Sequence, residues 1–208
     1  MKNIFLALVL VFLNPIEGFA DELEKVCNEQ NLNKAPDKKY YVIIHKLSVL
    51  LNKNLVSHHP LIVDAVVFNN LDYASEIDKQ KKEALNSALF FAFALGREEW
   101  IIKLINAGVD MYGQEASVVP FHGAAYGNCP EALGIALDFK VDLSRKDSGG
   151  LAFTDVIMLN KSSDVLIYYI DKIATENKAL MELGRVAEKY NRLDWFIEIR
   201  DKKYLGAE

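Results

Sequence analysis

Residues 120–131 read PFHGAAYGNCPE, and this stretch holds both halves of a recurring unit. Pro120 suits the first turn of a helix because its fixed φ is already helical. The alanine pair at 124–125 is small enough to let two helices approach, Asn128 suits a tight turn, and Glu131 suits the start of a second helix. The stretch therefore predicts a short helix, a turn and another helix.

The pattern around Asn128 recurs along the chain as a turn residue, an acid three positions later, and apolar residues directly after the acid and four further on. The turn residues are Asn69, Gly96, Asn128, Lys161 and Asn191, and the acids are Asp72, Glu99, Glu131, Asp164 and Asp194. A carboxylate in the first helical turn interacts favourably with the helix dipole, so each acid indicates a helix start. Since one helix pair cannot bury its apolar face alone, neighbouring pairs are expected to stack.

Three segments resemble the ankyrin repeat, whose unit is about 33 residues long. Residues 119–125 (VPFHGAA) stand at the start of a repeat, residues 106–110 (NAGVD) at the end of one, and residues 147–150 (DSGG) at the opening of the next. The resemblance implies an all-α, ankyrin-like helical repeat solenoid of about four to five helix-turn-helix units with N- and C-terminal capping helices. It also implies that His122 hydrogen-bonds neighbouring backbone. Two departures are Lys140 in place of a glycine and FTD at 153–155 in place of Pro-Leu-His.

The N-terminus resembles a signal peptide. Lys2 precedes an apolar run at 4–13 that is too short to cross a bilayer, and Ala20 gives a small residue before a cleavage point. These features predict export to the periplasm, without membrane insertion after cleavage. The expected organisation is a signal peptide at 1–20, an N-terminal arm at 21–37, and an ankyrin-like repeat domain at 38–208, with a cap helix at 38–59, repeats at 60–200 and a tail at 201–208.

Both cysteines, Cys27 and Cys129, lie after the predicted cleavage point. Disulfides persist in an oxidising compartment, so one interpretation is a bridge that closes a loop of about 100 residues. The alternative is two buried free thiols.

Several short segments resemble chemical motifs. Residues 147–150 resemble a serine-nucleophile signature, but a glycine-rich turn explains them better. The histidines at 58–59 lack a further ligand at metal-binding spacing. With net charge −5 and no dense basic patch, nucleic-acid binding is not expected. We therefore expect a non-enzymatic protein with no cofactor and no metal.

Recognition in ankyrin-like stacks falls on connection tips and on the exposed side of the first helices. The positions that this rule selects as partner-binding are Phe68, Leu95, Tyr112, Gln114, Glu115, Tyr126, Arg145, Lys146, Asp147, Ser148 and Tyr190. The expected partner is another protein. The first hypothesis is an immunity protein that neutralises a periplasmic toxin or effector, with the negative charge favouring a basic toxin. The alternative is a periplasmic scaffold or accessory factor for an envelope or oxidative-stress enzyme.

Overall fold

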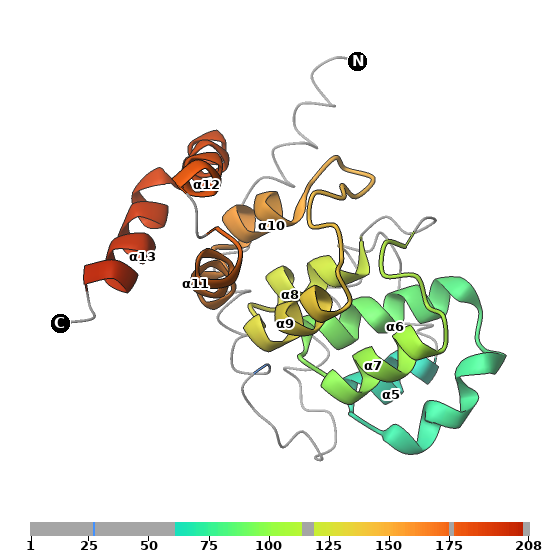
Figure 1. Cartoon of the computed structure of the whole chain (residues 1–208). Coiled ribbons are helices and arrows are strands. Elements are labelled where there is room, and N and C mark those ends of the chain that lie inside the picture. The colour runs from blue at the N-terminus through green and yellow to red at the C-terminus, as the bar shows by residue number, and fades with distance from the viewer. Residues whose placement is uncertain (1–26, 28–60, 114–118, 175–176, 206–208) are drawn as a thin grey trace, which may run out of the picture.

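The computed structural model describes Cys27 and residues 61–113, 119–174 and 177–205 (Figure 1). Every regular element in these ranges is helical, which confirms the predicted all-α class. The elements are α5 (Leu61–Val67), the 3-10 helix η1 (Leu71–Lys79), α6 (Lys82–Ala94), α7 (Glu98–Asn106), the 3-10 helix η2 (Pro120–His122), α8 (Gly123–Tyr126), α9 (Pro130–Asp138), α10 (Phe153–Asn160), α11 (Ser163–Lys172), α12 (Asn177–Lys189) and α13 (Leu193–Leu205). The predicted signal peptide, the arm other than Cys27, and the N-terminal cap helix lie outside the described residues, while α13 extends into the segment expected to be a tail.

Each predicted turn residue joins two consecutive helices and adopts the left-handed conformation that closes a helix. The φ angles are 52° at Asn69, 62° at Gly96, 52° at Asn128, 51° at Lys161 and 55° at Asn191. Glycine and asparagine tolerate this region best, so the predominance of these two residue types has a physical cause. The predicted acids all lie in first helical turns. Lys140, which stands where the ankyrin repeat has glycine, has a left-handed φ of 56°.

The helix pairs are arranged in a repeat-like fold with two rows of helices. In the first row, α5, α6, α8, α10 and α12 each contact the next. In the second row, η1 contacts α7, α9 contacts α11, and α11 contacts α13. Figure 1 shows the pairs following one another in chain order from the teal α5 to the red α13. Each pair thus buries its apolar faces against its neighbours.

Helix α6 lies at the centre of the core. Its side chains Phe90, Phe91 and Phe93 are essentially unexposed. Trp100 at the start of α7 is also 0% exposed, whereas Trp195, four residues after its own turn residue like Trp100, is only partly buried. The difference follows from position, because the last helix pair has no described pair beyond it to cover that side.

The closest approach between helices in this core is made by glycines. A Cβ atom on Gly127 would lie 1.7 Å from the Ala94 carbonyl oxygen, and one on Gly123 would lie 2.4 Å from that of Phe90. No side chain fits at either distance. The residues that bring α8 against α6 are therefore the two glycines that flank the alanine pair, as well as the alanines expected from the sequence.

The residue that follows each of three turns contacts the preceding helix pair. Arg97 donates from Nη2 to the Val67 carbonyl oxygen at 3.1 Å, and Ser162 donates from Oγ to that of Ala125. Cys129 occupies the corresponding position, and its Sγ lies 3.3 Å from the Ala94 carbonyl oxygen. We call these three contacts the turn ladder. It links the pairs α6–α7, α8–α9 and α10–α11 each to the one before it.

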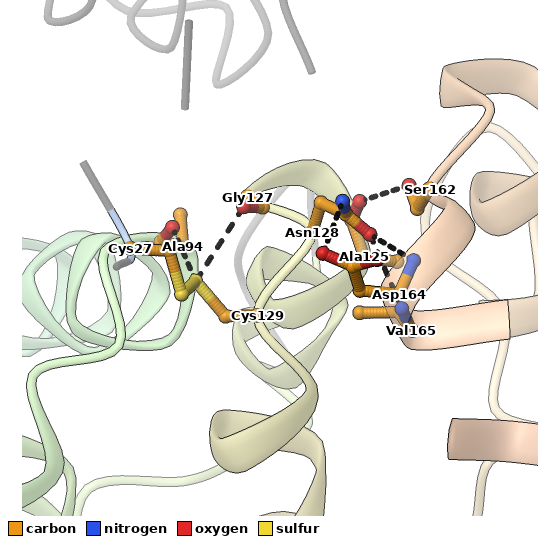
Figure 2. The surroundings of a disulfide bond; sticks show 9 residues. All are labelled: Cys27, Ala94, Ala125, Gly127, Asn128, Cys129, Ser162, Asp164 and Val165. Atoms are coloured by element: carbon orange, nitrogen blue, oxygen red, sulfur yellow. Dashed lines mark hydrogen bonds between the residues drawn. A yellow bond between two sulfur atoms is a disulfide. The ribbon is translucent and has the colours of Figure 1, made fainter. Parts of the chain in front are cut away.

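Cys129 also bonds Cys27, which confirms the bridge and excludes the interpretation as two free thiols (Figure 2). The two Cα atoms are 5.9 Å apart, a usual separation for a disulfide. Gly96 makes room for it, since a Cβ there would lie 3.2 Å from Cys27 Sγ. The bridge therefore fixes residue 27 at the junction of two successive turns.

Asn128 adds a second link, as Figure 2 shows. Its Oδ1 accepts hydrogen bonds from the backbone N–H groups of Asp164 at 2.9 Å and Val165 at 3.1 Å. N–H groups in the first turn of a helix have no partner within the helix, so Asn128 caps α11, a helix of the following pair. One residue thus forms its own turn and orders the next unit.

Candidate functional site

Two neighbouring connections supply a rigid, partly exposed surface. We define the tip surface as Tyr112, from the connection after α7, together with Arg145, Lys146, Asp147 and Ser148, from the connection after α9. Arg145, Lys146 and Ser148 are exposed, and Tyr112 and Asp147 are partly buried. All five were predicted as partner-binding positions, and the fold brings them to adjacent connections.

Tyr112 is held at both ends. Its backbone N–H donates to Asp110 Oδ1 at 2.9 Å, and its hydroxyl accepts from the Asp142 backbone N–H at 2.9 Å. The ring packs edge-on against Phe121, with the centroids 6.0 Å apart. The other ring contact is the Arg145 guanidinium, 5.9 Å from the ring centroid, within the range of a cation–π interaction. Tyr112 therefore connects the two loops and carries Arg145.

Asp147 folds the second connection. Its Oδ1 accepts from the backbone N–H groups of Gly149 at 2.8 Å and Leu151 at 2.9 Å, and its own N–H donates to the Leu151 carbonyl. Gly150 has a φ of 79°, which suits glycine. Burial raises the pKa of the Asp147 carboxyl, and the backbone donors act in the opposite direction. The DSGG segment is accordingly a self-hydrogen-bonded turn.

A polar cluster lies behind the tip surface. Asp155 accepts from Lys189 Nζ at 2.8 Å, from the Tyr190 hydroxyl at 3.0 Å and from the Ala152 backbone N–H at 2.8 Å. Burial by itself would raise the pKa of Asp155, but these three donors outweigh it and lower the pKa. The hydrogen bond between Lys189 Nζ and Asp155 also raises the pKa of Lys189. Asp155 thus ties the end of α12 to the start of α10.

Tyr126 and Tyr190 flank this cluster. Burial is the largest cause that raises the pKa of Tyr126, and the negative charge of Asp147 adds to it. Burial likewise raises the pKa of Tyr190. Both phenols are therefore neutral across ordinary pH, and Tyr190 acts as a hydrogen-bond donor to Asp155.

His122 is fully buried between the aromatic rings of Phe121 and Phe153, at centroid distances of 4.9 and 6.0 Å. Burial lowers its pKa to about 4, although the nearby Arg145 backbone and Asp155 favour the charged form. Neither ring nitrogen has a partner of hydrogen-bond geometry. The Arg145 backbone nevertheless lies close enough to favour the charged form as a hydrogen-bond partner, so the expectation that His122 hydrogen-bonds neighbouring backbone stays a prediction. Burial is the larger influence and favours the neutral imidazole.

The remaining predicted positions differ in how much surface they offer. Leu95 is 1% exposed and Tyr126 is 7% exposed, so neither contributes to the surface proposed below. Phe68 and Tyr190 are partly buried against the core. Gln114 and Glu115 lie outside the described residues.

Sequence reasoning missed Asp142, Asp155 and Lys189. Asp142 could have been found from the repeat spacing. It stands 32 residues after Asp110, and both aspartates lie two positions after a residue with a left-handed φ. The pairing of Asp155 with Lys189 had no such signal, because the two residues are 34 positions apart and meet only through the packing of α10 on α12.

No protein-family model, curated protein or solved structure matches this chain. None of the helices in the described ranges has the length and apolar character needed to cross a membrane. Within the same ranges, no three His, Cys, Asp or Glu side chains form a group that could hold a metal ion.

Proposed function

We propose that this chain is a non-enzymatic protein-binding module that contacts its partner through the tip surface. The observation that carries the proposal is the Tyr112–Arg145 pair, in which two consecutive connections present the residue types that dominate interface energetics. Tyr112 and the turn at 147–151 are already held by hydrogen bonds within the chain. Binding would consequently cost little conformational entropy.

The helix pairs are proposed to form an ankyrin-like stack. The left-handed turn residues, the two rows of helices and the turn ladder support this interpretation. Such stacks bind partners with their connections and first helices, which is where the tip surface lies.

The proposed partner is a toxin or effector in the periplasm, with this chain as its immunity protein. The signal-peptide pattern at 1–20 and the placement of two cysteines after it support export, and the bridge suits an oxidising compartment. The second candidate function is a scaffold for a periplasmic enzyme, and it is tested if the chain does not protect cells from a toxin.

Site-specific crosslinking tests the surface. A photoreactive amino acid at Lys146 in living cells should yield one discrete crosslinked species, and the same amino acid at Lys79 on η1 should not. Equal crosslinking from both positions would contradict the tip surface.

A protection assay tests the immunity role. The candidate toxin is the product of the gene next to the one that encodes this chain. Its expression in the periplasm should kill cells that lack this chain and spare cells that contain it. If deletion leaves cells unaffected by that product, the immunity role is lost. Copurification with a resident enzyme whose activity falls on deletion would then assign the scaffold role.

A further inference from the structure

Two side chains of the tip surface are cationic. Arg145 and Lys146 are both exposed, and no described carboxylate lies within ion-pair distance of either. The Arg145 guanidinium lies over the face of Tyr112. Its positive charge also helps the Ser144 hydrogen bonds to lower the pKa of Asp142.

The carboxylates of the same connections accept hydrogen bonds from the chain itself. Asp110 accepts from the Tyr112 backbone N–H. Asp142 accepts from the Ser144 backbone N–H at 3.0 Å and from its hydroxyl at 2.6 Å. Asp147 accepts from Gly149 and Leu151. These acids shape the loops, whereas the two cations are left to contact a ligand.

We propose that the tip surface recognises a carboxylate-bearing segment of its partner protein, with Arg145 as the bidentate donor and Lys146 as a second cation. This inference rests on the proposed protein-binding function. A planar guanidinium matches the geometry of a carboxylate, and stacking on an anchored tyrosine limits its motion before binding. The partner is therefore an acidic peptide segment or an acidic surface patch.

The net charge of the whole chain, −5, gave the opposite expectation of a basic partner. Net charge acts over long distances and is screened beyond about 10 Å at 0.1 M salt. At contact, the groups that meet the partner decide the preference. On the tip surface these groups include the exposed cations Arg145 and Lys146, whereas the carboxylates of the two connections accept hydrogen bonds within the chain.

The test uses two synthetic peptides, hexaglutamate and hexalysine, with the oxidised full-length protein labelled with ¹⁵N. Hexaglutamate at low salt should shift the amide resonances of Tyr112, Arg145 and Lys146, and hexalysine should not. The double variant Arg145→Glu/Lys146→Glu should bind hexaglutamate at least tenfold more weakly. The control Lys79→Glu reverses another exposed charge, on η1, and should leave the affinity unchanged.

Several outcomes would overturn the inference. These are the absence of hexaglutamate binding, a preference for hexalysine, or an equal loss of affinity in the double variant and in Lys79→Glu. The variants' helical circular dichroism establishes that they are folded, and Arg145→Lys adds a second measurement, because it keeps the charge but should lose affinity through the loss of bidentate geometry.

Failure of this inference can be told from failure of the proposed function. A crosslinked partner at Lys146 without hexaglutamate binding keeps the protein-binding function and removes the acidic specificity. Hexaglutamate binding without any crosslinked partner keeps the chemistry of the surface and removes the protein-binding function.

Discussion

Removal of the disulfide should cost this chain a large part of its stability. The bridge joins residues 102 positions apart, and Cys27→Ser removes it with little change to the core because Cys27 is only partly buried. In the chain-entropy model, a closed loop of about 100 residues contributes about 4.7 kcal/mol through restriction of the unfolded chain. That is a large fraction of the 5–15 kcal/mol typical of a folded domain.

A compensating contact should reduce this loss slightly. The Cys129 sulfur lies 3.3 Å from the Ala94 carbonyl oxygen, so a free thiol there can donate the hydrogen bond that Ser162 donates in the following pair. A net hydrogen bond contributes about 1 kcal/mol, and less for a thiol. The expected decrease in the free energy of unfolding is therefore about 4 kcal/mol.

Urea denaturation followed by the fluorescence of the buried Trp100 measures the change, with and without reductant. Reductant should lower the midpoint of the wild-type protein and should not affect Cys27→Ser. Cys129→Ser should match Cys27→Ser, because serine keeps a donor for Ala94. Cys129→Val should be about 1 kcal/mol less stable than either. Equal midpoints for oxidised and reduced wild-type protein would refute the reasoning.

Three further changes have expected outcomes. Gly127→Ala should lower the free energy of unfolding by more than about 3 kcal/mol, because its Cβ would overlap the Ala94 oxygen. The control Gly184→Ala in α12 makes ordinary contacts and should be neutral or stabilising by up to about 1 kcal/mol. Equal effects of the two substitutions in thermal or urea unfolding would contradict the close helix approach. Asn128→Gly keeps the left-handed turn but removes the side chain that caps α11, and should lower the free energy of unfolding by about 1 kcal/mol in the same assay. An unchanged midpoint would show that the cap does not contribute to stability. The pKa of His122 is about 4 in the folded protein and 6.5 in the unfolded chain, so the unfolded state binds a proton first as the pH falls. The free energy of unfolding should therefore decrease by about 3 kcal/mol between about pH 6.5 and pH 4. His122→Gln should lose this pH dependence.

The sequence predicted the turns well, because their cause is local. Asn69, Gly96, Asn128 and Asn191 are the residue types that accept a left-handed φ, and Lys161 was found only because it stands at the same spacing. The acid that follows each of them also acts within its own helical turn. Features whose cause lies within a few residues can be read from periodicity.

The contacts between units could not be predicted in the same way. The surroundings of His122, for example, include Phe153, which lies 31 positions further along the chain and packs with its ring centroid 6.0 Å from that of the imidazole. The position of Cys129 matches those of Arg97 and Ser162 in the turn ladder. That equivalence involves three different side chains and becomes visible only when each is seen against the preceding helix pair.

For the candidate site, the sequence identified the connections but not the roles within them. Tyr112 and Arg145 were chosen separately, and their contact depends on Asp142 holding the tyrosine hydroxyl. Leu95 was chosen by the same positional rule and is buried, because the packing of α6 at the centre of the core overrides the rule. Position within a repeat therefore predicts location better than it predicts exposure.

The disulfide also sets an order of events during synthesis. Cys27 leaves the ribosome about 100 residues before Cys129, and the bridge joins it to the far side of a junction built from α6, α7, α8 and α9. In the folded chain both sulfur atoms lie beside the turn at Gly96. Assembly of the central helix pairs around that turn therefore brings the two cysteines together and favours formation of the bond, which in turn stabilises the assembled pairs.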